Sequence, residues 1–166
     1  MNESGSIWIV AALGISAVGC GGPLDADAIE ARLVDFDTAG DFTRVNATSF
    51  PSQHQANTVN IWVSSEGLAT YLGVDPDDTT DSVEAFPMDT MIVKEMLDEG
   101  GARAGLTVMV KGAQGGVPTT AGWWWGRFSA DGTLEQGGRV QFCIDCHRDN
   151  ELERTDWVRG VPMDNR

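Results

Sequence analysis

Basic residues are scarce in this chain. It has 11 Lys and Arg against 25 Asp and Glu, which gives a formal net charge of −14 at pH 7. This balance argues against nucleic-acid binding, which depends on basic patches, and it gives no attraction to anionic membrane surfaces. The acidic residues are spread along the chain and fit a soluble domain. The charge either serves solubility alone or steers a basic partner protein to the surface.

Long hydrophobic runs are also missing. The apolar run at residues 7–18 is shorter than the ~20 residues that a transmembrane helix needs. It fits the core of a signal peptide over residues 1–19, and residues 17–20 resemble a bacterial lipobox in which Cys20 becomes lipidated. Residues 1–6 contain no Lys or Arg, so either the true start lies upstream or the signal is weak. The alternative is a buried N-terminal strand or helix with an incidental cysteine.

Cysteine is rare, with three in the chain, and two of them form one motif. Cys143, Cys146 and His147 have the Cys-x-x-Cys-His spacing of a c-type haem attachment site. The two thiols would add to the two vinyl groups of one haem, and His147 would ligate the iron from the proximal side. A zinc knuckle needs four ligands, and only Cys20 and His54 remain to complete one. A disulfide or a redox Cys-x-x-Cys pair does not need the histidine.

Alternating apolar residues and turn signals predict a chain dominated by strands. We expect an α+β fold, mainly an antiparallel β-sheet with a few short helices, and a haem attachment motif near the C-terminus. The expected strands are residues 58–63, 91–97, 106–111 and 123–128. The expected helices are residues 24–33, a short helix through Leu72 with Ser64 or Ser65 as N-cap and Gly73 as C-cap, and residues 151–158. Residues 40–53 are predicted to be a loop.

The late position of the motif separates this chain from the common small electron-transfer cytochromes, which carry it near the N-terminus. Four-helix cytochromes also carry it late, but their upstream sequence has a helical period that this chain lacks. The sixth iron ligand decides between two functions: an open distal site permits small-molecule chemistry, whereas a protein ligand limits the haem to electron transfer. We favour an open site. His54 lies in a polar segment and reads as a surface residue, and the candidate methionines are Met88, Met91, Met96, Met109 and Met163.

Several ordered blocks resemble one family. They are Phe86-Pro87, residues 91–95, residues 105–111, Trp123-Trp124-Trp125, residues 129–132, residues 142–147 and Asp156-Trp157-Val158. Together they look like the cytochrome P460 family, which also includes the cytochromes c′-beta, over roughly residues 58–161. The resemblance implies a mostly β-sheet, usually dimeric, periplasmic protein with one haem, a proximal histidine and an open distal face. Catalytic members oxidise hydroxylamine and have a lysine bonded to the porphyrin, whereas c′-beta members bind nitric oxide or carbon monoxide in an apolar pocket.

The resemblance also suggests distal residues. Lys94 matches the cross-linking lysine if its side chain points inward; if it points outward, Glu95 faces the core instead. Glu95 and Glu84 are the nearest acids for a distal carboxylate, and Thr107 stands where one might be sought. Phe86 and Phe128 are candidate apolar caps of the distal pocket. Lys111 ends its strand and is expected to be solvated, and Trp124 should face away from Trp123 and Trp125.

These expectations combine into one hypothesis. Residues 1–19 form a signal peptide, residues 20–57 a linker with a helix, and residues 58–166 a haem domain. The mature protein is exported to the periplasmic face and anchored in a bacterial membrane only through lipid on Cys20. It carries one covalently bound haem c, acts on hydroxylamine or nitric oxide, passes electrons to a soluble cytochrome, and forms a homodimer. The rival hypothesis is an electron carrier with a Met or His sixth ligand.

Overall fold

The computed structural model describes residues 23–51, 58–78, 80, 82–149 and 152–166. The predicted signal peptide, Cys20 and His54 lie outside the described residues. Within those residues, no helix is both long and apolar enough to cross a membrane.

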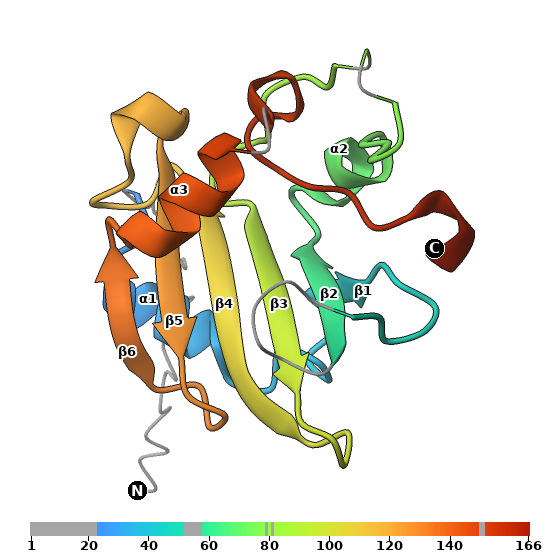
Figure 1. The fold of residues 1–166 in the computed structure, drawn as a ribbon. Helices are drawn as coiled ribbons and strands as arrows, with labels where there is room; N and C mark the ends of the chain where they lie inside the picture. Colours follow the sequence, from blue (N-terminus) through green and yellow to red (C-terminus); the bar gives the residue numbers. More distant parts are fainter. Residues whose placement is uncertain (1–22, 52–57, 79, 81, 150–151) are drawn as a thin grey trace, which may run out of the picture.

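Six antiparallel strands form one sheet, in which every strand lies beside its neighbour in the sequence. They are β1 (Phe42–Arg44), β2 (Thr58–Ser64), β3 (Met91–Leu97), β4 (Arg103–Lys111), β5 (Trp123–Phe128) and β6 (Leu134–Gly138). Figure 1 shows this meander with short helices on both sides. The predicted α+β class, mainly antiparallel sheet, is confirmed, and four of the six strands match predicted ones. The structure adds β1, inside the segment predicted to be a loop, and β6.

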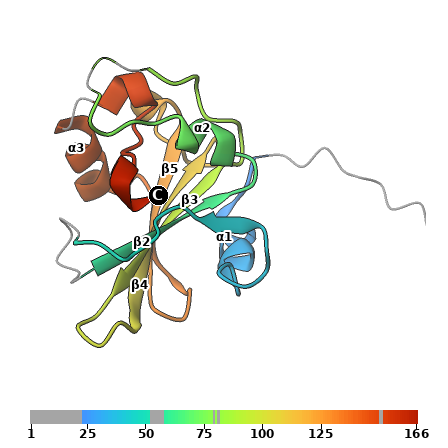
Figure 2. The ribbon, with the colours of Figure 1, turned by 90° about the vertical axis from the view of Figure 1, so that its right-hand side faces the viewer.

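Both faces of the sheet are buried. One face, here called the front, carries Ile61, Ile92, Met109 and Trp125, which belong to one apolar cluster. The opposite face, the back, carries Val93, Val108 and Trp124 within a second cluster. Because successive strand residues point to opposite faces, each strand supplies both cores. Figure 2 shows the two layers edge-on, with helix α3 on one side of the sheet and helix α1 on the other.

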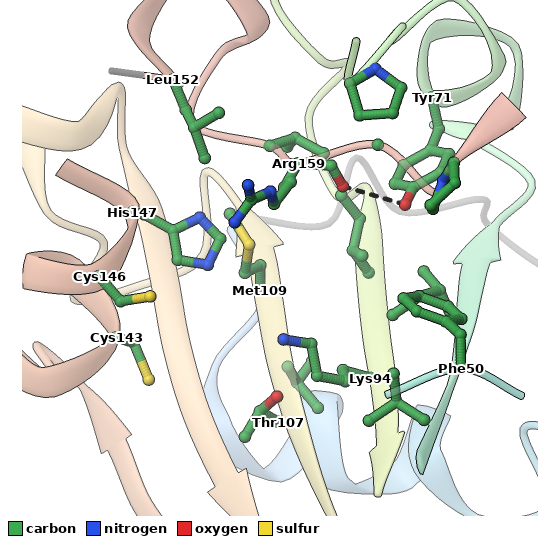
Figure 3. Close-up of a pocket in the computed structure, with 18 of the residues that line it drawn as sticks. Phe50, Tyr71, Lys94, Thr107, Met109, Cys143, Cys146, His147, Leu152 and Arg159 are labelled. Carbon is green, nitrogen blue, oxygen red and sulfur yellow. Dashed lines mark hydrogen bonds between the residues drawn. The ribbon is translucent and has the colours of Figure 1, made fainter. Parts of the chain in front are cut away.

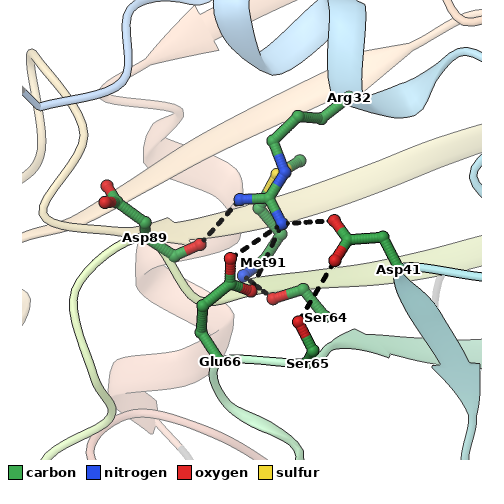
Figure 4. Close-up of polar contacts among 7 residues, drawn as sticks. All are labelled: Arg32, Asp41, Ser64, Ser65, Glu66, Asp89 and Met91. Atoms are coloured by element: carbon green, nitrogen blue, oxygen red, sulfur yellow. Dashed lines mark hydrogen bonds and ion pairs between the residues drawn. The ribbon is translucent and has the colours of Figure 1, made fainter. Parts of the chain in front are cut away.

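Helix α1 (Ala26–Leu33), which the sequence predicted over residues 24–33, covers the back face. Asp25 caps it, accepting a hydrogen bond from the Ala28 amide at 2.9 Å, and Ile29 and Leu33 are buried. Arg32 ties the helix to the rest of the chain (Figure 4): its guanidinium lies 2.7 Å from Asp41 and 3.1 Å from Glu66, and it donates to the Asp89 carbonyl. Residues 26–44 therefore share the sheet and the back core with the predicted haem domain.

Helix α2 (Leu68–Leu72) begins later than predicted. Its N-cap is Gly67, without a side-chain hydrogen bond, and its C-cap is Gly73 as expected. Ser64 instead belongs to β2, and its hydroxyl accepts a hydrogen bond from the Met91 amide at 2.9 Å. A Cβ at residue 67 would collide with the side chain of Thr90, so this close approach requires glycine.

The C-terminal region differs most from the prediction. The haem motif lies on helix α3 (Gln141–Asp149), and a 3₁₀ turn (Leu152–Thr155) replaces the helix predicted over residues 151–158. Asp156 and Trp157 follow it with positive φ values of 51° and 68°, which no helix can contain. Their side chains and carbonyls bond to distant elements, and these tertiary contacts override the local helix propensity. Two more 3₁₀ turns are Pro118–Thr120 and Met163–Asn165.

Candidate haem site

A cavity of about 370 Å³ lies between the front face and the C-terminal segments. The sheet supplies Ile61, Ile92, Lys94, Thr107, Met109 and Trp125, and Phe50 lies beside β2, where it pairs with Val59. The rest of the lining includes Tyr71, Leu152, Val158, Arg159 and residues of α3. Figure 3 shows Lys94, Thr107 and Met109 of the sheet on the same side as Cys143, Cys146 and His147 of α3 and Arg159 of the chain after it. The volume lies within the ~300–1,000 Å³ range of small-molecule and cofactor sites.

Helix α3 presents the whole motif to this cavity. Cys143, Cys146 and His147 all line it, because residues spaced by three and four lie on one face of a helix. Neither cysteine is in a disulfide, and Cys143 is buried. Burial raises the pKa of the Cys143 thiol, and the nearby positive charge of Lys94 opposes that rise. Two thiols and an imidazole therefore meet in one mainly apolar space.

His147 is held in a defined orientation. Its Nδ1 lies 2.6 Å from the carbonyl oxygen of Trp157, and its ring packs edge-on against Trp125 with 4.6 Å between centroids. Because a carbonyl only accepts, Nδ1 must carry the proton and the lone pair lies on Nε2. Metal-ligating histidines have this arrangement, with the second ring nitrogen donating to a carbonyl or carboxylate.

Lys94 points into the cavity, which resolves the two orientations that the alternation left open. It pairs with Ile61 of β2 and Thr107 of β4 in the sheet, both of which also line the cavity. Figure 3 shows its amine directed towards α3. Within the part of the chain that the structure describes, the amine makes no hydrogen bond and no ion pair. Burial lowers its pKa from 10.5, an effect partly opposed by Cys146 and Cys143.

The predicted distal pocket of Phe86, Glu95 and Phe128 is not the one that forms. Glu95 faces the back, where its carboxylate accepts hydrogen bonds from Asn60 at 3.0 Å, Trp62 at 3.1 Å and Arg103 at 2.9 Å. Phe128 also belongs to the back cluster. Phe86 lies on the front side, but it packs edge-on against Trp123 at 5.6 Å and does not line the cavity. Glu95 and Phe128 were misassigned because both faces of the sheet are covered, which alternation alone does not reveal, and Phe86 lies in a loop, where no alternation applies.

The remaining predicted residues are also distributed between the two faces. Of the candidate methionine ligands, Met109 lines the cavity, and Met96 packs half-buried against the front cluster without lining it. Met91 faces the back, and Met88 and Met163 are exposed. Glu84 is exposed, and Asp77 is the carboxylate found among the described lining residues. The tryptophans alternate as expected: Trp123 and Trp125 face the front and Trp124 faces the back.

Lys111 contradicts its predicted solvation. It is buried, and its Nζ lies 2.6 Å from the Asp156 carboxylate. Sequence reasoning also missed Phe50, Tyr71 and Arg159 as lining residues. They come from loops, the short helix α2 and the C-terminal segment, where no periodicity indicates the direction of a side chain.

The cavity fits a haem on several counts. Its wall is mainly apolar, as a haem ring requires. The two thiols and the imidazole on that wall are the groups that a covalently held haem needs for attachment and for ligation of the iron. The indole Nε1 of Trp125, a lining residue, is buried without a hydrogen-bond partner, and a bound polar group could accept from it. Among the described residues, no three or more His, Cys, Asp or Glu side chains are grouped to hold a bare metal ion. Cys20 and His54, the remaining candidates for a zinc site, lie outside those residues.

Comparison with known proteins places this site in a family. No curated protein matches the chain at a significant level. The family model described as Cytochrome P460 matches residues 42–159, which include every strand and the whole haem motif. This match covers most of the chain and extends the resemblance noted in the sequence to β1. The chain therefore belongs to the cytochrome P460 family, and its family cofactor is haem.

Proposed function

We propose that this protein is an exported c-type haem protein that acts on small nitrogen species, by oxidising hydroxylamine or by binding nitric oxide. One haem is attached through Cys143 and Cys146, and His147 is its proximal ligand. The observation that carries the proposal is the convergence of these three side chains and Lys94 on one apolar cavity. A bound haem supplies an iron centre that binds small ligands and exchanges electrons.

The chain's own residues hold and shield that centre. Helix α3 places both thiols on the cavity side, and the Trp157 carbonyl fixes the tautomer of His147. The apolar wall formed by residues such as Phe50, Ile61 and Ile92 excludes water, which strengthens electrostatic interactions inside. Asp77, at the rim, is the carboxylate that could carry protons, in place of the predicted Glu95.

Lys94 is the residue that would separate the two activities. A buried amine with a lowered pKa is more often neutral, and a neutral amine is nucleophilic. We propose Lys94 as the site of a second bond to the porphyrin, as in the catalytic members of the family. Without that bond, the same residue would be a polar group in a gas-binding pocket of the c′-beta kind.

The test is the absorption spectrum of protein matured with a c-type haem assembly system, oxidised and reduced, with and without carbon monoxide and nitric oxide. A red-shifted, broadened Soret band on reduction, lost in Lys94→Ala, together with hydroxylamine turnover, supports the enzyme. An ordinary high-spin spectrum that shifts with either gas, and is unchanged in Lys94→Ala, supports the binder. A protein that takes up no haem overturns the proposal.

Electron transfer alone remains the second candidate because Met109 lines the cavity. A thioether ligand would make the iron six-coordinate and low-spin, and carbon monoxide would then bind poorly. Met109→Leu conserves volume and removes the sulfur. Carbon monoxide binding that appears only in this variant would favour the electron carrier, whereas binding in both proteins would exclude Met109 as the ligand.

We further propose that the protein is exported, is lipid-anchored through Cys20, dimerises, and delivers electrons to a soluble cytochrome. The net charge of −14 supports a basic acceptor, because opposite charges accelerate encounter at low salt. Membrane fractionation of the wild type and of Cys20→Ala tests the anchor. Release of the variant into the soluble periplasmic fraction is expected, and an unchanged distribution would contradict the anchor.

A further inference from the structure

A buried ion pair includes Asp156, whose chain neighbour Trp157 contacts the predicted proximal histidine through its carbonyl. The Nζ of Lys111, at the end of β4, lies 2.8 Å and 2.6 Å from the two carboxylate oxygens of Asp156, and both side chains are less than a tenth exposed. The same Nζ lies 5.1 Å from the ring centre of Trp123. Asp156 also accepts a hydrogen bond from the Phe86 amide at 2.8 Å. The carboxylate is thus fixed by two different elements.

The backbone around Asp156 is held as tightly as its side chain. The Trp123 indole donates to the Asp156 carbonyl at 2.7 Å. Asp156 and Trp157 both have positive φ, a conformation that is costly for residues other than glycine and persists only where surrounding contacts impose it. The Trp157 amide donates to the Leu152 carbonyl at 2.7 Å, which closes the turn.

This strained turn fixes the position of the Trp157 carbonyl. That oxygen accepts from Nδ1 of His147 at 2.6 Å. One peptide unit therefore separates the ion pair from the acceptor that orients the imidazole. Strand β5 contributes twice, since Trp123 bonds to Asp156 while Trp125, two residues along on the same face, packs against the His147 ring.

We infer that Lys111 and Asp156 are positioning residues that hold the Trp157 carbonyl against His147 and so tune the iron that His147 would ligate. A strong acceptor on the second ring nitrogen makes an imidazole a better donor to a metal, and such partners affect metal sites strongly. Stability alone does not require this pair, because well-packed apolar residues often replace a buried ion pair at no cost. The inference rests on the proposed haem attachment and on His147 as the ligand.

The test uses three single variants of the holoprotein. Asp156→Asn keeps the shape and weakens the charge-assisted bonds; Lys111→Met keeps the stem and removes the charge; Trp123→Phe removes the donor to the Asp156 carbonyl. Each is measured by the resonance Raman iron–histidine stretching band of the ferrous protein and by the haem reduction potential. All three are expected to lower the band frequency and to make the potential more positive, with the smallest shift for Trp123→Phe.

Matched controls exist on the opposite face of the sheet. Glu95 there accepts from Arg103 and from the Trp62 indole, so Arg103→Met and Trp62→Phe disturb a similar network that does not touch His147. They should lower the unfolding temperature, as the front variants do, and leave the band and the potential unchanged. Band shifts in the controls as large as those in the front variants would overturn the inference.

The outcomes distinguish a failure of the proposed function from a failure of the positioning role. A wild-type protein without covalent haem, or without an iron–histidine band, defeats the proposed function itself. A normal wild-type band that does not move in Asp156→Asn and Trp123→Phe defeats only the positioning role. Should Lys111→Met fail to fold, these two variants still decide, because Asp156→Asn keeps the size of the side chain and Trp123→Phe keeps an aromatic ring in the core.

Discussion

Lys94 and Glu95 are neighbours in β3 and face opposite sides of the same sheet, and they meet opposite environments. On the back, Glu95 is satisfied by Asn60, Trp62 and Arg103. On the front, Lys94 has no hydrogen-bond or ion-pair partner among the described residues, and burial lowers the pKa of its amine. A buried ionisable group with a full set of partners is a structural feature of the fold. A buried ionisable group without partners in a cavity indicates a functional site, where a bound ligand or a reaction involves that group.

The same contrast extends to the aromatic residues of β5. On the back, Trp124 packs closely over the backbone of Gly126 and Gly137, where any added Cβ would collide with its ring. On the front, Trp125 leaves its buried indole nitrogen without a partner beside the cavity. The back face is thus complete as it stands, and the front face is complete only with a ligand.

Removing the thiols from the front face should have the largest effect. In the Cys143→Ala, Cys146→Ala double variant, we expect covalent haem to fall from about one per chain to none. The reason is that thioether bonds need both sulfurs. The measurement is the haem that stays with the chain after extraction with acidified organic solvent. Haem retained by the double variant would mean that another residue, with Lys94 first among the candidates, carries it.

Glu95→Ala should be the most destabilising change on the back face. It leaves the Asn60 and Trp62 donors without their acceptor and leaves Arg103 with Asp37 as its one remaining carboxylate partner among the described residues, and breaking a buried network of this kind costs about 3 kcal/mol. Urea denaturation measures the loss. The haem spectrum should stay the same, and a spectral change comparable to that of Lys94→Ala would show that the two faces are not separate.

Lys94→Met should stabilise the haem-free chain, whereas Glu95→Ala destabilises it. We expect a gain of about 1 kcal/mol at neutral pH, since the variant lacks a buried amine without hydrogen-bond or ion-pair partners among the described residues. Because the folded pKa lies below 10.5, the unfolded chain binds more protons between these two values, and wild-type stability rises with pH there. The advantage of the variant is therefore full below the lowered pKa and disappears as the pH approaches 10.5. A pH series of urea denaturations checks this, and a constant difference across the series would contradict it.

Asp41→Asn should have the smallest effect. Hydrogen bonding to Arg32 lowers the pKa of Asp41, so its stabilising contribution is present above the ordinary value of 3.8 and is lost as the pH falls through the lowered one. The group is largely exposed, and we expect about 0.5 kcal/mol at neutral pH. The wild-type and variant curves should converge in acid; curves that stay equally far apart there would contradict the assignment.

The sequence predicted the centre of the sheet well and its edges poorly. Strands β2 to β5 were found because Val59, Ile61 and Val63 and their counterparts alternate or form apolar runs. Strand β1 has only three residues, and β6 is a mostly exposed edge strand ending in two glycines, so neither carries that signal. Helix α3 was not predicted because its residues were interpreted as a haem attachment motif and were not tested for helical periodicity.

The haem-attaching residues of the site could be predicted from the sequence, but the residues that surround them could not. Cys143, Cys146 and His147 followed from spacing alone, and the structure brings all three to one cavity. The direction of Lys94 could not be predicted, since a buried Glu95 is tolerable only because Asn60 and Trp62 of β2 and Arg103 of β4 donate to its carboxylate. The Lys111–Asp156 pair joins residues 45 positions apart, and nothing local to either residue indicates the other.

The most direct measurement is peptide mapping by mass spectrometry of the wild-type chain after export and haem maturation. We predict that the peptide containing Cys143 and Cys146 carries the mass of one haem, and that no haem mass lies elsewhere, except for a cross-link to the Lys94 peptide if the catalytic form is correct. Unmodified thiols at both positions would contradict the central claim that the front cavity is a c-type haem site.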